Sequence, residues 1–170
     1  MNTLVMDLLE LSRFEAKAKE LHLETVDLYA LMQSVLKRME NVVTERGLAV
    51  ILPQAEQDRF LVEADLEMLR VVLVNFISNA VKYAEKEIWI DISKKGRTLT
   101  FAITNDGKSI EHIENVWDEF YKEEHCGSGS SGLGLAIAKQ ILLLHNAKFG
   151  AKSECGKTVF WFTIKTEVLD

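Results

Sequence analysis

Apolar residues recur at helical spacing in the middle of the chain, in a run that begins near Asp65. They stand at i, i+3, i+4, i+7, i+8 and i+11 and are Leu69, Val72, Leu73, Phe76, Ile77 and Ala80. Because this spacing places all of them on one face of a helix, it predicts a core helix, and Asp65 is a suitable N-cap for it.

The same helix carries a polar stripe formed by Asn75, Asn79 and Lys82, which stand at i, i+4 and i+7. An amide offers both an acceptor and a donor, and a lysine offers a point charge suited to phosphate. The stripe could therefore bind a hydrated cation and contact a polyphosphate. The alternative is an ordinary solvated face, since helices of globular domains normally carry a polar side.

Helical periodicity also marks three other segments. Residues 3–20 carry a near-heptad stripe, which is typical of one strand of a coiled coil or helical bundle. Asp27 is a good N-cap for a helix over residues 28–46, which Gly47 would end. A further helix is expected over residues 133–145, preceded by a short one over residues 113–120.

Alternation of apolar and polar residues predicts the strands. They are expected at residues 21–26, 49–52, 60–62, 87–93, 98–104, 148–154 and 158–166, with a loop at 54–59 and a turn at 105–110. Hairpins rather than βαβ units connect them. We therefore predict an α+β fold, a two-layer sandwich with a mixed, mostly antiparallel sheet packed on three helices, and the helix at residues 3–20 outside it.

Composition fits one soluble domain with a helical appendage, and we place the boundary between residues 1–20 and 21–170. The 170 residues are 48% hydrophobic and 27% charged, without an apolar run long enough to cross a bilayer or a visible signal peptide. The expected location of this part of the protein is cytoplasmic. A net charge of -6 without a basic run argues against nucleic acid as a partner. Cys126 and Cys155 have no metal-ligand spacing.

A glycine-rich segment over residues 127–134 leads directly into a predicted helix. Glycines let the backbone approach an anion, and the free amides of a helix N-terminus bind phosphate. This predicts a flexible loop that closes on a nucleotide, and the alternative is a surface linker. The segment is neither a Walker A sequence nor a dinucleotide-binding fingerprint.

Four segments, in this order and spacing, resemble the N box, first glycine box, F box and second glycine box of sensor histidine kinases. They are Asn75-x-x-x-Asn79-Ala80-x-Lys82-Tyr83, Asn105-Asp106-Gly107-x-x-Ile110, Phe120-Tyr121-Lys122 and Ser131-Gly132-Leu133-Gly134-Leu135-Ala136-Ile137. The resemblance covers about residues 20–165, and residues 7–13 resemble the end of the second dimerisation helix of these kinases. It implies a Bergerat-type ATP-binding domain of the gyrase, heat-shock-chaperone, histidine-kinase and MutL (GHKL) superfamily.

The resemblance also implies roles for individual residues, with ATP and Mg²⁺ as the ligands. Asn79 would coordinate Mg²⁺ with Asn75 beside it, Lys82 would reach phosphate, Tyr83 would pack near the adenine or ribose, and Lys122 would contact the terminal phosphate. Asn75, Asn79 and Lys122 would be the catalytic residues. The ATP site would be completed by Asn105, Gly107, Ile110, Gly132, Leu133, Gly134, Leu135 and Thr158.

The chain departs from the family pattern at several positions. Asn105 stands where an aspartate usually accepts a hydrogen bond from the adenine amino group, and a neutral acceptor predicts weak ATP affinity. Ser109 and Ser130 replace glycines of the two glycine boxes. The phosphorylated histidine is missing, because His22, His112, His125 and His145 all lack the sequence setting of the phosphorylated helix.

The resemblance implies a catalytic fragment that would pass the γ-phosphoryl group of ATP to a histidine on its own dimerisation domain, for signalling to a response regulator. An amide at Asn75, where ATP-hydrolysing relatives carry a glutamate, fits transfer better than fast hydrolysis. The full-length kinase would lie in the cell membrane, and this fragment would be monomeric or weakly paired. The alternatives are a degenerate GHKL domain that acts as a protein-interaction module, and an ATP-driven clamp of the chaperone or topoisomerase type.

Overall fold

The structure is a computed structural model that describes residues 21–53, 60–121 and 131–166. Its elements in chain order are β1 (Glu24–Asp27), α2 (Leu28–Glu45), β2 (Ala49–Ile51), β3 (Leu61–Ala64), α3 (Leu66–Tyr83), β4 (Glu87–Lys95), β5 (Thr98–Asp106), the 3-10 helix η1 (Ile113–Trp117), α4 (Gly134–Leu144), β6 (Lys148–Glu154) and β7 (Lys157–Lys165). The helix expected at residues 3–20, the loop at 54–59 and the first half of the glycine-rich segment, residues 127–130, lie outside the described residues.

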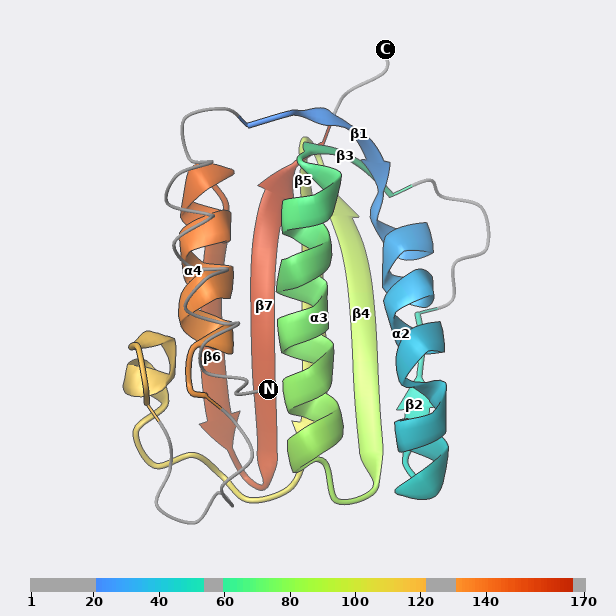
Figure 1. Ribbon diagram of the computed structural model, residues 1–170, viewed down its shortest axis with the longest axis vertical. Coiled ribbons are helices and arrows are strands. Elements are labelled where there is room, and N and C mark those ends of the chain that lie inside the picture. Colours follow the sequence, from blue (N-terminus) through green and yellow to red (C-terminus); the bar gives the residue numbers. More distant parts are fainter. Residues whose placement is uncertain (1–20, 54–59, 122–130, 167–170) are drawn as a thin grey trace.

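A five-stranded sheet in the order β2-β4-β5-β7-β6 forms one layer, and α2, α3 and α4 cover one of its faces (Figure 1). The β2–β4 pair is parallel, and the other pairs are antiparallel. A separate antiparallel ribbon of β1 and β3 lies at one end of the helices. The predicted α+β sandwich with a mixed, mostly antiparallel sheet is confirmed.

The core lies between the helix layer and the sheet, as the apolar spacing predicts. Every residue of the stripe predicted on α3 is buried, and Phe76 of that stripe is fully inaccessible. Its ring lies 5.8 Å from that of Phe160 and 6.1 Å from that of Phe162, both on β7. Aromatic pairs at this separation stabilise beyond their buried area, so they fix α3 over the middle of the sheet.

Helix caps read from the sequence set the starts of α2 and α3. The Asp27 carboxylate accepts hydrogen bonds from the amides of Tyr29 at 3.0 Å and Ala30 at 3.3 Å, and that of Asp65 accepts from Met68 at 3.1 Å. Each aspartate satisfies donors that would otherwise be unpaired at a helix N-terminus. Both predicted N-caps are confirmed.

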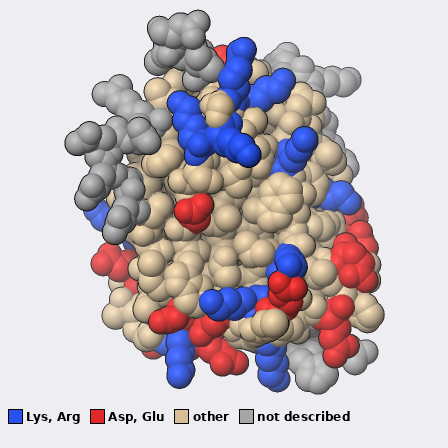
Figure 2. All heavy atoms as spheres, turned by 180° about the vertical axis from the view of Figure 1, so that it is seen from behind, with Lys and Arg blue, Asp and Glu red and all other residues tan. Residues whose placement is uncertain are grey.

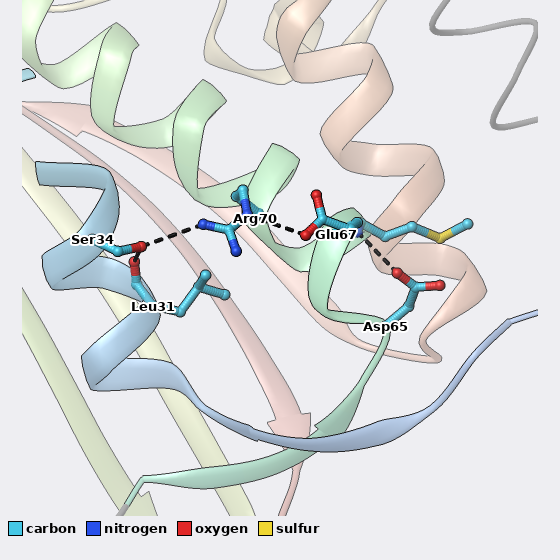
Figure 3. A network of polar contacts seen from close by, with 6 residues as sticks. Leu31, Ser34, Asp65, Glu67 and Arg70 are labelled. Atoms are coloured by element: carbon cyan, nitrogen blue, oxygen red, sulfur yellow. Dashed lines mark hydrogen bonds and ion pairs between the residues drawn. The ribbon is translucent and has the colours of Figure 1, made fainter. Parts of the chain in front are cut away.

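Arg70 connects α3 to α2 near the start of α3 (Figure 3). Its Nε lies 3.5 Å from a Glu67 oxygen, and its Nη1 donates to the Ser34 hydroxyl on α2 at 3.4 Å. Ser34 in turn donates to the carbonyl of Leu31 at 2.7 Å. These contacts align α3 beside α2, although such exposed pairs contribute little to stability.

The face of the sheet opposite the helices is nearly free of acidic and basic side chains across its middle (Figure 2). Residues that alternate with the buried ones point to this side, and on β7 they include the half-buried Val159, Trp161 and Thr163. At the start of β7 the Lys157 ammonium lies 4.3 Å from the centre of the Trp89 ring on β4, across the one intervening strand β5.

Several boundaries differ from the sequence prediction. β5 continues through Asp106, because Asn105 still pairs with Thr158 of β7 and Asp106 with Lys157. The first two residues of the turn expected at 105–110 therefore belong to a strand. The short helix is a single 3-10 turn over Ile113–Trp117, and β1 starts only at Glu24. Alternation alone cannot show where strand pairing begins or stops.

Candidate functional site

The polar stripe of α3 lies along the C-terminal half of the helix. Asn75 and Asn79 are half-buried, whereas Lys82 and Tyr83 are exposed. The Asn75 amide donates from Nδ2 to the carbonyl of Val71 at 3.1 Å, which turns its oxygen away from its own helix. Among the described residues, no group forms a hydrogen bond with the side-chain amide of Asn79.

The second glycine box begins directly beside this stripe. A β-carbon on Gly134, the first residue of α4, would lie 2.5 Å from Asn75 Oδ1. Real β-carbons do not approach another atom so closely, so a side chain at position 134 would have to displace the Asn75 amide. The N-terminal amides of α4 therefore lie next to Asn75, although the two segments are 59 positions apart in the sequence (134 - 75).

The first glycine box reaches the same place from β5. Gly107 has a φ of 135°, and a β-carbon on it would lie 2.6 Å from the carbonyl oxygen of Tyr83 at the end of α3. Its amide donates to the carbonyl of Gly156 in the β6–β7 turn at 2.9 Å. A glycine is required here both for the positive φ and for the close approach of the backbone.

Asn105 is buried beside this glycine, with 4% of its surface exposed. Its Nδ2 donates to the carbonyl of Asp106 at 2.8 Å, and this bond leaves its Oδ1 as the acceptor. On the neighbouring strand its partner is Thr158, which is also buried. An adenine amino group would meet an acceptor here, as the resemblance implies, but a neutral one.

Ser153 extends this network and was not singled out in the sequence. Its hydroxyl lies 2.8 Å from Thr158 Oγ1 and accepts a hydrogen bond from the Ile110 amide at 2.8 Å. Ser109 accepts from the Gly156 amide at 3.2 Å, so the serine in place of a glycine ties the loop to the hairpin. The hairpin register would have pointed to Ser153, because it lies directly across from Thr158.

Asp106 forms hydrogen bonds with the segment that connects α3 to β4. Its carboxylate accepts hydrogen bonds from three consecutive amides, those of Glu85, Lys86 and Glu87, at 2.9 to 3.1 Å. Partial desolvation raises the pKa of Asp106, but the backbone hydrogen bonds outweigh it and hold this pKa below its usual value. The side chain of Asp106 thereby ties the first glycine box to the segment that directly follows the N box.

The two ends of the segment between the F box and the second glycine box lie together. The Phe120 amide donates to the carbonyl of Gly132 at 3.0 Å, and a β-carbon on Gly132 would lie 2.9 Å from the Phe120 backbone. Leu133 is buried and Leu135 half-buried at the start of α4. Lys122 lies outside the described residues, so its predicted role stays a prediction.

The histidines contribute no reactive cluster within the described part of the chain. His145 donates from Nδ1 to the carbonyl of Ile141 at 2.8 Å, and its Nε2 accepts from the Asp65 amide at 3.0 Å. It thus links the end of α4 to the start of α3. His125 lies outside the described residues.

The donor set fits Mg²⁺ held together with a polyphosphate. Across the described ranges, no group of three or more His, Cys, Asp or Glu side chains could hold a metal ion. Mg²⁺ needs no such cage, because it usually keeps several waters and binds through one or two protein oxygens plus substrate phosphates. Asn79 offers such an oxygen, and the start of α4 and Lys82 offer donors to phosphate.

A bilayer-spanning segment is not found among the helices of the described residues.

Comparison with known proteins identifies the family of the chain. Residues 64–168 match the family model of histidine kinase-, DNA gyrase B- and HSP90-like ATPases. The sensor histidine kinase WalK of Bacillus subtilis is 32% identical over 171 aligned positions, which cover 95% of this chain and 28% of WalK. The sensor histidine kinase YkoH of the same organism is 30% identical over 143 positions, which cover 81% of this chain and 31% of YkoH. The chain thus spans less than a third of these curated relatives.

Solved structures show the same fold. Full-length ShkA in complex with AMPPNP superposes with a TM-score of 0.83 at 26% identity, over 98% of this chain and 36% of ShkA. The nucleotide-free catalytic domain of the histidine kinase ThkA gives a TM-score of 0.76 at 23% identity, over 85% of this chain and 96% of that domain. The chain belongs to the family of histidine kinase-, DNA gyrase B- and HSP90-like ATPases, as an ATP-binding domain of the histidine-kinase type.

Proposed function

We propose that the chain binds Mg·ATP between the polar stripe of α3, the end of β5 and the N-terminus of α4. In this assignment Asn79 coordinates Mg²⁺, and Asn75 and Lys82 lie along the phosphates. Tyr83, Asn105, Gly107, Ile110 and Thr158 surround the adenosine. The backbone of Gly132, Leu133, Gly134 and Leu135 covers the phosphates, and Lys122 reaches the terminal one.

The observation that carries this proposal is the contact between Asn75 and Gly134. It brings the N box and the second glycine box together, with the free amides of an eleven-residue helix at the junction. Those amides and the positive end of the helix dipole favour an anion, and the neighbouring asparagines supply neutral oxygens for its counter-cation.

In the full-length protein, we propose that the bound nucleotide gives its γ-phosphoryl group to a histidine on a dimerisation domain, from which a response regulator takes it. The amide of Asn75 supports transfer rather than hydrolysis. Its Nδ2 is bound to Val71 and its oxygen faces Gly134, and an amide at position 75 cannot take a proton from water as a glutamate would. A location of the full-length kinase in the membrane and a monomeric state of this fragment stay predictions.

Calorimetric titration with a non-hydrolysable ATP analogue, with and without Mg²⁺, tests the proposal. The wild-type chain should bind in a metal-dependent way, and Asn79→Ala should lose the metal dependence. Binding would then justify a phosphotransfer assay on a supplied dimerisation domain. Failure to bind at millimolar nucleotide would favour the degenerate interaction module, and steady-state ATPase activity that Asn79→Ala abolishes would favour the ATP-driven clamp.

A further inference from the structure

Arg46, the residue that follows α2, reaches across to the C-terminal end of α3. Its Nη1 donates hydrogen bonds to the carbonyl oxygens of Val81 and Lys82, the latter at 2.9 Å, and its Nη2 donates to the carbonyl of Ala84 at 3.0 Å. The last carbonyls of a helix have no partner within it and carry the negative end of its dipole. A planar cation with several donors suits this position, so Arg46 caps α3 from a different helix.

The residues that follow the end of α3 are held by a negatively charged side chain, that of Asp106. The carbonyls of Val81, Lys82 and Ala84 accept hydrogen bonds from Arg46, whereas the amides of residues 85–87 donate to the Asp106 carboxylate. The turn between α3 and β4 is therefore fixed through its backbone on both sides. Bonds that involve a charged group are stronger than neutral ones, so this turn should be rigid despite its surface position.

The fixed segment carries two residues of the proposed nucleotide site. The backbone carbonyl of Lys82 is itself bound by Arg46, and the carbonyl of Tyr83 lies against Gly107 of the first glycine box. Both side chains remain exposed. Arg46 thus acts on the backbone of these residues and leaves their side chains accessible to a ligand.

We propose that Arg46 is a positioning residue of the nucleotide site, which it serves by holding the end of α3 so that Lys82 and Tyr83 face the ligand. This inference rests on the proposed ATP binding. It assigns a role to the residue that follows α2, which lies outside all four sequence boxes.

The variant Arg46→Met tests the proposal, because it keeps an unbranched side chain and removes every donor. Its dissociation constant for the ATP analogue with Mg²⁺ should rise about five- to twentyfold, as expected for losing hydrogen bonds from a charged group. Arg46→Lys should give an intermediate value, because a point charge serves fewer carbonyls. Arg38→Met is the matched control: it removes the same charge from an exposed position of α2 and should change affinity less than about twofold.

Amide hydrogen exchange of residues 84–87 in the nucleotide-free chain gives a readout that does not depend on ligand. Exchange should be faster in Arg46→Met and unchanged in Arg38→Met, at a temperature where both variants are folded. Faster exchange with unchanged affinity would overturn the positioning role, and unchanged exchange would show that Arg46 does not hold the segment. If the wild-type chain bound no nucleotide, the proposed function would fail and this role with it, whatever the exchange rates.

Discussion

The side-chain oxygen of Asn75 occupies the space in which any side chain at position 134 would begin, 2.5 Å from the β-carbon that Gly134 lacks. Asn75 belongs to the core helix α3, and Gly134 opens α4. The pair joins the metal-binding end of the proposed site to its phosphate-binding end. Its consequences can be tested directly.

Gly134→Ala should destabilise the chain by about 1–2 kcal/mol, because its β-carbon would displace the Asn75 side chain from its hydrogen bond with the Val71 carbonyl. It should also weaken binding of the ATP analogue, since the start of α4 would move away from α3. Chemical denaturation and calorimetry would measure the two effects.

A double-mutant cycle with Asn75→Ala isolates the contact. Removing the Asn75 amide leaves only its β-carbon, at 3.9 Å, near an alanine at position 134. Gly134→Ala should therefore be nearly neutral for stability in that background, with a coupling free energy of about 1 kcal/mol or more. Additive losses would show that the two residues do not meet in solution.

Asp106→Asn should lower the free energy of unfolding at pH 7 by about 1–2 kcal/mol, because an amide accepts the three backbone hydrogen bonds more weakly than a carboxylate. The folded-state pKa of Asp106 lies below its unfolded value. Its contribution is thus fully present above the ordinary aspartate pKa of about 3.9 and is lost as the pH falls through the folded-state pKa.

Denaturant titrations of wild type and Asp106→Asn from pH 7 downward check this sign. The stability difference should shrink below about pH 4. Asp91→Asn, at an exposed position of β4 where the side chain forms no hydrogen bond with any described residue, serves as the control and should change stability by less than about 0.5 kcal/mol. A stability difference between wild type and Asp106→Asn that grows on acidification would contradict this role of the Asp106 carboxylate.

Asn105→Asp should have opposite effects on stability and on affinity. The substitution removes the donor to the Asp106 carbonyl and buries a charge beside an oxygen, which should cost the nucleotide-free chain about 1–3 kcal/mol. A charged acceptor should bind the adenine amino group more strongly, so affinity for the ATP analogue should rise. Thermal unfolding should show a lower melting temperature than wild type without nucleotide, and a smaller difference when the ATP analogue saturates the site. An unchanged melting temperature in both states would refute the prediction.

Ser153→Ala should destabilise the chain by about 1–3 kcal/mol, because it leaves the buried Thr158 hydroxyl and the Ile110 amide without their partner. Affinity for the ATP analogue should fall as well, since both groups border the proposed adenosine site. Ser93→Ala, at an exposed position of β4, provides the comparison. Equal unfolding midpoints for the two variants would mean that the Ser153 network is not formed in solution.

Particular residues show why the fold could be read from the sequence while parts of the site could not. Asp27 and Asp65 cap helices through contacts three residues away or less, and the stripe on α3 repeats at a fixed period. Such signals are local and survive in a linear pattern. Arg46 and Asp106 act on residues at least 19 positions away, and nothing in their own surroundings indicates the partner.

The sequence by itself determined the α+β class, the core face of α3, the polar stripe on the same helix and the four boxes that resemble histidine kinases. These depend on residue type and spacing alone. Tertiary structure decided which boxes touch and how: Gly134 on Asn75, Gly107 on Tyr83, and the end of α3 held between Arg46 and Asp106. Such contacts depend on strand register and helix packing over distances of tens of residues, which a periodic pattern does not encode.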